Sequence, residues 1–212
     1  MHLYESIIPS GNAYKVQLLL AHLGISYETT ALDILATPSE TRTPEFLKLN
    51  PNGGIPVLVL DDGTPLAESN AILCYLAEGT RYLPDDKVNK ARVLRWMFFE
   101  QNSHEIYVGV WKFLTYWCPT GFSHLSEHEI NTLRERGQKA IDVMERHLAD
   151  GNKKFFVDET FTIADICLYA YTSHAEKVGF EVGEKVKEWL KRVESQEGHV
   201  RIKKDATGKC PY

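Results

Sequence analysis

Three short segments of the chain carry side chains whose types and spacing could bind or activate a ligand. The first is Ser10-Gly11-Asn12, which places a hydroxyl and an amide between a predicted strand at residues 2–5 and a helix. The carboxyl end of a strand is where α/β units usually carry out their chemistry. Considered alone, the segment is better explained as an ordinary serine turn.

The second segment runs from Asn50 to Leu58 and contains Ile55-Pro56 at the start of an apolar strand. Proline cannot donate a hydrogen bond to a sheet, but a cis bond before it could turn the backbone of Ile55 outward. The N–H and C=O of Ile55 could then pair with an extended peptide ligand, as an added strand would. The alternative is an ordinary trans proline, because only ~5% of X-Pro bonds are cis.

The third segment is Glu68-Ser69, at the start of a predicted helix over residues 69–78. The Ser69 hydroxyl and the first backbone N–H groups of that helix form an anion site, and Glu68 could receive an ammonium. The pair therefore suits a ligand with a carboxylate and an ammonium on one carbon, as at the end of a γ-glutamyl group. A plain helix cap beside an exposed acid is the alternative.

The elements around these segments predict a small α/β unit in the order β-α-β-α-β-β-α. Two of the helices have clear boundary signals, because Gly24 closes the first and Thr43-Pro44 opens the second. In the first helix Asn12 is a possible cap. The expected strands cover 2–5, 26–33, 55–60 and 64–67.

After about residue 87 the pattern changes to helices only. The expected helices cover 91–114, 127–149, 162–177 and 183–195, and the last residues, from about 198, have no regular pattern. We therefore expect an N-terminal domain over 1–80, a linker over 81–87 and an all-helical domain over 88–212.

Composition and charge argue against nucleic acid, membrane, secretion and metal as features of this chain. The net charge is -5 and no wide basic run is present, which argues against a nucleic acid. No apolar run approaches the ~20 residues of a membrane helix, and the N-terminus lacks a secretory pattern. The four cysteines are widely spaced, which argues against a disulfide framework and a zinc site and favours the reducing cytoplasm.

Four separated motifs in this order resemble the soluble glutathione transferase family. They are Asn50-Pro51, Ile55-Pro56-Val57-Leu58, Glu68-Ser69 and Phe161-Thr162-Ile163-Ala164-Asp165. In the last of them Thr162 and Asp165 form an N-terminal capping box. The resemblance extends over nearly the whole chain and is closest to the serine- or asparagine-using types, which include bacterial, theta-like and tau-like members.

The resemblance implies a thioredoxin-like α/β N-terminal domain that binds glutathione and an all-α C-terminal domain. By this analogy Pro56 follows a cis bond and the Ile55 backbone pairs with the cysteinyl part of glutathione. Glu68 and Ser69 hold the γ-glutamyl end. Ser10, five residues before Lys15, is the first choice for the residue that activates the thiol, and Asn12 is the second.

Activation would follow from ordinary thiol chemistry. A free cysteinyl thiol has a pKa of ~8.5, so only a few per cent is thiolate at neutral pH. A hydroxyl that donates a hydrogen bond to sulfur favours the thiolate, as does the positive end of the first helix. Many relatives have lysine or glutamine where this chain has Gly54, so Arg42 or Asn52 could supply that ligand contact instead.

The family places its second substrate between the domains, against the first helices of the C-terminal part. The candidates here are aromatic and neighbouring side chains, namely His104, Tyr107, Val108, Trp111 and Tyr116. Each residue of such an aromatic stripe is more often helical core than pocket. The resemblance also implies a homodimer, with glutathione as co-substrate and no metal.

Three activities are compatible with these residues. The chain could transfer glutathione to a small electrophile, or use glutathione to reduce a peroxide. It could instead be a non-catalytic module for glutathione binding or assembly. A thiol-disulfide oxidoreductase on the same fold is the third possibility, which the lack of CxxC and of any cysteine near Ser10 weakens.

Overall fold

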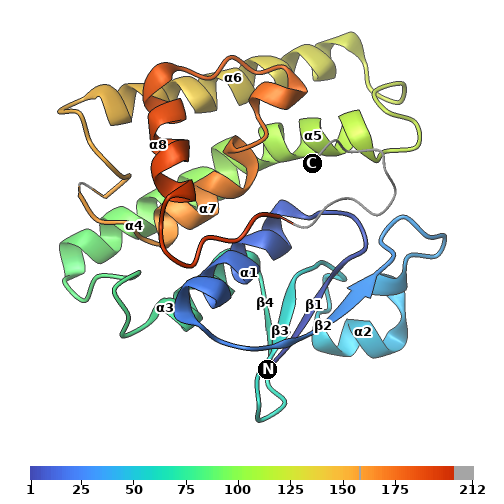
Figure 1. Cartoon of the computed structure of the whole chain (residues 1–212). Helices are drawn as coiled ribbons and strands as arrows, with labels where there is room; N and C mark the ends of the chain where they lie inside the picture. The colour runs from blue at the N-terminus through green and yellow to red at the C-terminus, as the bar shows by residue number, and fades with distance from the viewer. Residues whose placement is uncertain (158, 203–212) are drawn as a thin grey trace. The chain divides into compact units, whose positions relative to one another are not determined.

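The computed structural model describes residues 1–157 and 159–202, which divide into two compact units (Figure 1). One unit contains Met1–Glu78 together with the described residues 197–202, and the other contains Gly79–Gln196. The domain limits expected from the sequence, 1–80 and 88–212, stay a prediction.

A four-stranded mixed sheet forms the centre of the first unit. Its strands lie in the order β2-β1-β3-β4, with β1 and β2 parallel and the other neighbours antiparallel. The strands are β1 (His2–Ser6), β2 (Glu28–Leu32), β3 (Val57–Val59) and β4 (Pro65–Ala67). The predicted order of strands and helices is confirmed.

The register of the sheet brings three chain segments to one edge. Tyr4 of β1 lies opposite Val57, the first residue of β3, and Val57 lies opposite Ala67, the last residue of β4. Ile55-Pro56 and Glu68-Ser69 therefore lie just beyond this row of paired residues, and Ser10 follows four residues after β1 ends at Ser6. The edge where β1 and β4 end is thus the edge where β3 begins.

The helices of this unit are α1 (Gly11–Leu23), α2 (Pro44–Leu49) and α3 (Ser69–Ala77), and α1 and α3 pack side by side (Figure 1). The cap of α1 is Ser10 and not Asn12, because Ser10 Oγ accepts a hydrogen bond from the N–H of Ala13 at 3.3 Å. Asn12 instead lies inside the first turn. Gly24 ends α1 in the left-handed conformation, as expected.

The described residues after Gln196 contact α1 of the first unit. The Tyr14 hydroxyl donates to the carbonyl of Val200 at 2.7 Å. A ring nitrogen of His22 lies 2.8 Å from the carbonyl of Glu197. Both contacts join this segment to α1.

The second unit is helical, and its first helix differs from the expected one. The sequence predicted one helix over 91–114, but the structure has α4 (Lys87–Phe99), a π-helical segment (Glu100–Gly109) and α5 (Val110–Tyr116). Glu100, His104 and Val108 are buried at a spacing of four residues. The wider π turn keeps these three side chains on one face, and π segments often occur at functional sites.

Three further α-helices lie in the described part of the second unit. They are α6 (Glu127–Ala149), α7 (Ile163–Thr172) and α8 (Glu184–Glu194), with a short 3-10 turn at Glu176–Val178. The predicted capping box at the start of α7 is confirmed. The Thr162 hydroxyl accepts a hydrogen bond from the backbone of Asp165, and the Asp165 carboxylate accepts one from the backbone N–H of Thr162. None of the helices in the described ranges is long and apolar enough to cross a membrane.

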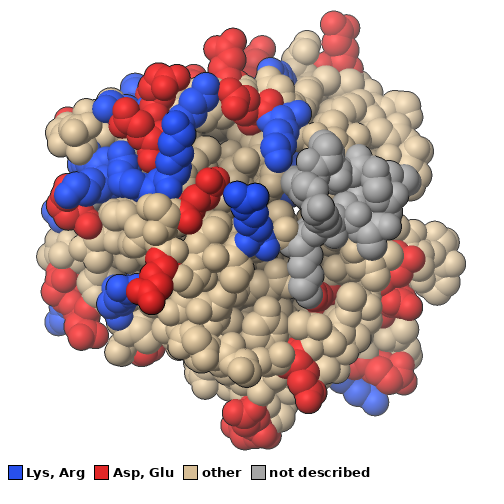
Figure 2. Space-filling model, in the orientation of Figure 1, with Lys and Arg blue, Asp and Glu red and all other residues tan. Residues whose placement is uncertain are grey.

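Charged side chains are mixed in sign over the face shown in Figure 2. Lysine and arginine lie among aspartate and glutamate there, and no wide field of one sign covers that face. This mixture agrees with the small net charge of -5.

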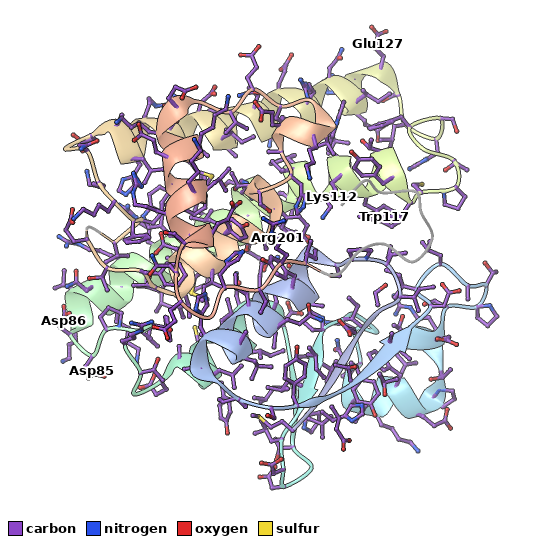
Figure 3. All side chains as sticks on the ribbon, in the orientation of Figure 1. Asp85, Asp86, Lys112, Trp117, Glu127 and Arg201 are labelled. Carbon is purple, nitrogen blue, oxygen red and sulfur yellow. The ribbon has the colours of Figure 1, made fainter. Side chains whose placement is uncertain are left out.

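A buried ammonium and a buried imidazole lie close together in the second unit. Lys112 of α5 is 1% exposed, and its Nζ lies 5.4 Å from the ring centre of Trp117 (Figure 3). Burial, together with the charges of Lys112 and Lys177, lowers the pKa of His174 to about 2. His174 is therefore neutral in the folded protein at neutral and mildly acidic pH.

This shift predicts how stability depends on pH. Below pH ~6.5 the unfolded chain protonates His174 but the folded chain does not. Above pH ~6.5 the stability is therefore retained. Below pH ~6.5 the free energy of unfolding falls by about 1.4 kcal/mol for each pH unit through His174 alone. Denaturant unfolding between about pH 7 and pH 5 measures this slope. His174→Gln should flatten it and the exposed His128→Gln should not; equal slopes in both variants would contradict the assignment.

Candidate functional site

Three polar side chains from α1 and α3 meet at the sheet edge described above. Lys15 Nζ donates to Asn12 Oδ1 at 2.8 Å and to Ser69 Oγ at 3.4 Å. Ser69 Oγ in turn donates to Asn12 Oδ1 at 3.3 Å. Because Asn12 and Ser69 lie 57 residues apart in the chain, the fold joins two of the three segments identified from the sequence.

These bonds determine which way the Asn12 amide points. Its oxygen must face Lys15, because the reverse orientation would place an NH₂ donor against an ammonium, which has only donors. Asn12 therefore presents Nδ2 on the other branch of its amide as a hydrogen-bond donor. A donor at the N-terminus of a helix is suited to an anion such as a thiolate.

Ser10 provides the second donor at this end of α1. Its Oγ accepts from the backbone N–H of Ala13, and a hydroxyl that accepts one bond keeps its own hydrogen to donate. Ser10 and Asn12 are both partly exposed. The start of α1 thus combines a hydroxyl donor, an amide donor and the positive end of a helix.

The other two segments, Ile55-Pro56 and Glu68-Ser69, have uncommon backbone conformations. The Ile55–Pro56 peptide bond is cis, as expected, and Ile55 lies just outside β3. Glu68 has a φ of 69°, although it is not glycine. Such a backbone is strained for a residue with a Cβ, and strain of this kind concentrates at ligand sites. Glu68 is exposed, whereas Ser69 beside it is buried.

Arg42 and Asn52 contact each other in the loop that precedes Ile55. Arg42 Nη1 donates to the Asn52 carbonyl at 3.0 Å, and a Cβ added at Gly53 would lie 2.6 Å from the same nitrogen. Asn50 Nδ2 also donates to the Gly54 carbonyl at 2.8 Å. These bonds hold the loop that leads to the cis bond.

Lys15 is the site residue that sequence reasoning missed. The sequence showed only its spacing from Ser10, whereas the structure shows its amino group between Asn12 and Ser69. One signal could have identified it. A lysine at position 15, between Tyr14 and Val16 in a mostly apolar helix, is anomalous, because lysine is almost never fully buried unless it is paired.

The residues expected to receive a second substrate have different surroundings. His104 is fully buried, and its Nε2 lies 3.0 Å from Thr172 Oγ1; Val108 is also buried. Trp111 is partly exposed and donates through Nε1 to the Val178 carbonyl at 3.0 Å. The Tyr116 hydroxyl lies 3.5 Å from the Lys177 carbonyl.

Tyr107 lines a cavity of about 430 Å³ in the helical unit. The cavity has an apolar part that includes Phe99 and Val143 and a polar part that includes Asn102 and Arg136. Arg136 Nη1 donates to the Tyr107 hydroxyl at 2.9 Å. The five predicted residues therefore divide into two buried ones, His104 and Val108, and three partly exposed ones, Tyr107, Trp111 and Tyr116.

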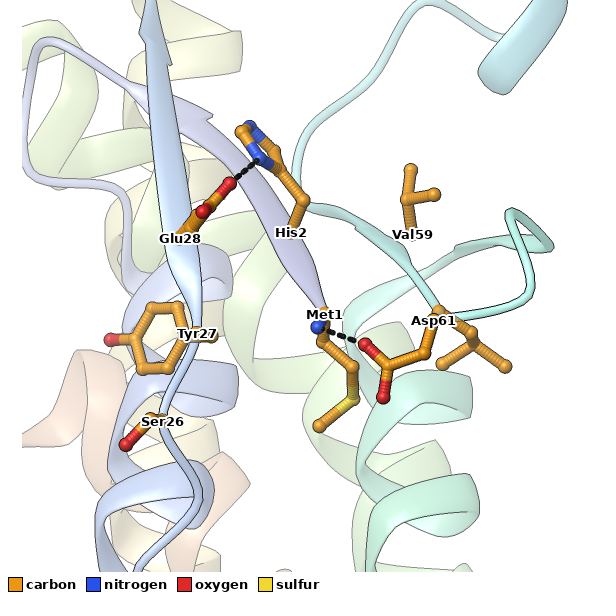
Figure 4. A pocket seen from close by; sticks show the side chains of 8 residues that line it. Met1, His2, Ser26, Tyr27, Glu28, Val59 and Asp61 are labelled. Atoms are coloured by element: carbon orange, nitrogen blue, oxygen red, sulfur yellow. Dashed lines mark hydrogen bonds and ion pairs between the residues drawn. The ribbon is translucent and has the colours of Figure 1, made fainter.

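A hollow of about 500 Å³ lies at the opposite edge of the sheet (Figure 4). Met1 and His2 line it at the start of β1, with Glu28 at the start of β2 and Val59 at the end of β3. His2 Nδ1 lies 3.4 Å from Glu28 Oε2. The edge that carries Ser10, Ile55 and Ser69 is the other one, so this hollow is separate from the candidate site.

Comparisons with known proteins agree on one family. Residues 9–78 match the family model described as glutathione S-transferase, N-terminal domain, and residues 106–197 match that of the C-terminal domain. A glutathione S-transferase structure from Pseudomonas fluorescens is 44% identical, with a TM-score of 0.84 over 94% of this chain and 97% of that one.

The names of two further relatives describe two different activities. The disulfide-bond oxidoreductase YfcG of Escherichia coli is 28% identical over 198 residues, which are 89% of this chain and 88% of that protein. The glutathione transferase URE2P6 from Phanerochaete chrysosporium, solved with oxidized glutathione, is 26% identical. Its TM-score is 0.79 over 93% of this chain and 91% of that one.

Proposed function

Because this chain belongs to the glutathione S-transferase family, we propose that it binds glutathione and activates its thiol for attack on a small, apolar electrophile. The observation that carries the proposal is the meeting of Asn12 with Ser69 at the N-termini of α1 and α3. The cis Ile55–Pro56 bond lies at the same sheet edge. One tripeptide could contact all three segments there.

Each segment has a part in this proposal. The backbone of Ile55, before Pro56, pairs with the cysteinyl residue as an added strand would. Glu68 receives the α-ammonium of the γ-glutamyl group, and Ser69 with the first N–H groups of α3 receives its carboxylate. Arg42 and Asn52 hold the preceding loop, and one of them supplies the ligand contact that Gly54 lacks.

The thiol then lies at the start of α1. Ser10 donates to the sulfur through its hydroxyl and Asn12 through Nδ2, and both bonds favour the thiolate over the thiol. The helix N-terminus adds its positive field. The thiolate attacks the electrophilic atom and a new S–C bond forms, while the leaving group departs with the electron pair of the bond that breaks. Tyr107, Trp111 and Tyr116 are the partly exposed residues of the predicted electrophile site.

The direct test is a pair of measurements on the purified protein. Calorimetric titration measures glutathione binding, and turnover of a generic aryl halide or an organic peroxide measures thiol transfer. Binding together with turnover supports the proposal. Binding without turnover of any electrophile would favour the non-catalytic module, and no binding would exclude both.

Glu68 offers a sharp prediction for the binding half of the proposal. Glu68→Gln should weaken glutathione binding about tenfold, because a hydrogen bond to a charged group contributes roughly 1.5–3 kcal/mol and the exposed position reduces that. Glu45→Gln is the matched control, since Glu45 is also an exposed acid at the start of a helix. Equal dissociation constants for the two variants would remove Glu68 from the site.

One observation favours a second candidate function. The relative YfcG is named a disulfide-bond oxidoreductase, and the same activated thiolate could attack a disulfide. In that reaction two glutathione molecules reduce one disulfide to two thiols, and oxidized glutathione is the other product. Rates with a small dialkyl disulfide and with an aryl halide, measured at equal glutathione, decide between the two activities.

The assembly and the location of the protein are further parts of the proposal. We propose a homodimer, supported by the exposed apolar residues Phe98, Ile106 and Val110, which recur at spacings of eight and four residues. Light scattering coupled to size exclusion measures the mass and tests this. A cytoplasmic location is proposed on the family resemblance and the cysteine pattern, and fractionation of the source cells tests it.

A further inference from the structure

Lys15 is a buried cation at the candidate site. Its side chain is 0% exposed although it lies in the second turn of α1. Removing an ammonium from water is costly unless it is paired and hydrogen-bonded. Lys15 Nζ donates to Asn12 Oδ1 at 2.8 Å and to Ser69 Oγ at 3.4 Å, and both acceptors belong to the proposed glutathione site.

The neighbouring buried polar residue of the same helix shows a different arrangement. Gln17 is 7% exposed and donates through Nε2 to Glu5, which is also buried. That pair joins α1 to β1. Lys15 instead joins α1 to the N-terminus of α3, where two of the three ligand-contacting segments meet.

We propose that Lys15 is the positioning residue that fixes the Asn12 amide and links the thiol end of the site to its γ-glutamyl end. This inference rests on the proposed function and adds a residue to it. Lys15 has only donors, so Asn12 must turn its oxygen inward and its Nδ2 donor toward the sulfur.

Lys15 also makes this orientation independent of Ser69. The Ser69 hydroxyl has one hydrogen, which it gives to Asn12 Oδ1 at 3.3 Å. When a ligand carboxylate takes that hydrogen, the shorter bond from Lys15 still holds the Asn12 oxygen. The buried positive charge of Lys15 additionally favours the thiolate over the neutral thiol.

The test compares two variants by the pH dependence of their activity and by the ultraviolet absorbance of the bound thiolate. Lys15→Met removes both the charge and the donor. Lys15→Gln removes the charge but keeps an amide donor that can still bond Asn12 Oδ1. In Lys15→Met we expect the pKa of bound glutathione to rise by about one unit, with about tenfold lower kcat near neutral pH. Lys15→Gln should be intermediate.

The pH profile distinguishes positioning from simple structural support. The defect of Lys15→Met should shrink at high pH, where glutathione ionises without help, whereas loss of folded protein would lower the rate at every pH. Gln17→Met is the control, because it removes a buried donor from the same helix but should leave the thiol pKa unchanged. If Lys15→Met does not fold, the Lys15→Gln profile alone decides the matter.

Two outcomes would overturn the inference, and they are distinguishable. A thiol pKa equal to that of the wild type in the folded Lys15 variants would refute the role of Lys15 and leave the proposed function intact. Failure of the wild-type protein itself to bind glutathione would refute the proposed function and the inference together. A raised thiol pKa with partial recovery in Lys15→Gln supports the proposal.

Discussion

Ser10→Ala is expected to lower kcat/KM for glutathione conjugation of an aryl halide by about 10- to 100-fold at neutral pH. The variant removes a hydroxyl donor to the thiolate, and hydrogen bonds to charged groups contribute roughly 1.5–3 kcal/mol, which corresponds to factors of that size. Ser10 also caps α1 through Ala13 N–H, so part of the effect could come from a frayed helix start. Ser10→Gly separates the two, because glycine preserves most of the cap.

Two comparisons make this prediction decisive. Ser26→Ala, at the opposite edge of the sheet, should leave the rate unchanged. Asn12→Ala removes the second donor and should lower the rate by a factor of similar size. Unchanged activity in Ser10→Ala with a large loss in Asn12→Ala would transfer the main role to Asn12. Steady-state kinetics at saturating electrophile, with glutathione varied, measures all four variants.

Asp165→Ala is expected to lower the free energy of unfolding by about 3–5 kcal/mol, in line with the loss of a buried charged hydrogen-bond network. The carboxylate accepts from the backbone N–H groups of Phe156 and Thr162, both at 3.0 Å, and from Trp189 Nε1 at 2.9 Å. The side chain is fully buried. Alanine would leave these donors without their acceptor in the core of the helical unit.

The pKa of Asp165 depends on both its burial and these hydrogen bonds. Burial raises it to about 6, while the bonds from Phe156, Thr162 and Trp189 lower it and so favour the charged form. Glu129→Ala is a matched control, since Glu129 holds the same position in the capping box of α6 but is exposed. Glu129→Ala should lower the free energy of unfolding by only a small part of the loss expected for Asp165→Ala. Urea unfolding of both variants measures the difference, and equal losses would contradict the argument.

Local signals made much of the fold predictable. Gly24 and Thr43-Pro44 mark helix boundaries, and Thr162 with Asp165 marks the start of α7, because caps act on backbone groups within one turn. The π-helical segment Glu100–Gly109 was not predictable in the same way. Its burial pattern depends on partners in other helices, such as Thr172, which contacts His104.

The candidate site shows the same division. Sequence patterns suggested Ser10, Ile55-Pro56 and Glu68-Ser69 as separate segments, and each alone had an ordinary structural explanation. The sheet register places all three at one edge. Register depends on hydrogen bonds between distant residues and on which faces are buried, so no window of the sequence reveals it.

By itself, the sequence determined the order of strands and helices, the family resemblance and the three candidate ligand-binding segments. Only the tertiary structure decided that Ser10 caps α1, that Asn12 turns its oxygen toward Lys15, and that Lys15 reaches Ser69. The physical reason is the sequence separation over which each interaction acts. Caps and turns act within a few residues, whereas the bond between Asn12 and Ser69 spans 57 residues of chain and forms only when α1 and α3 pack together.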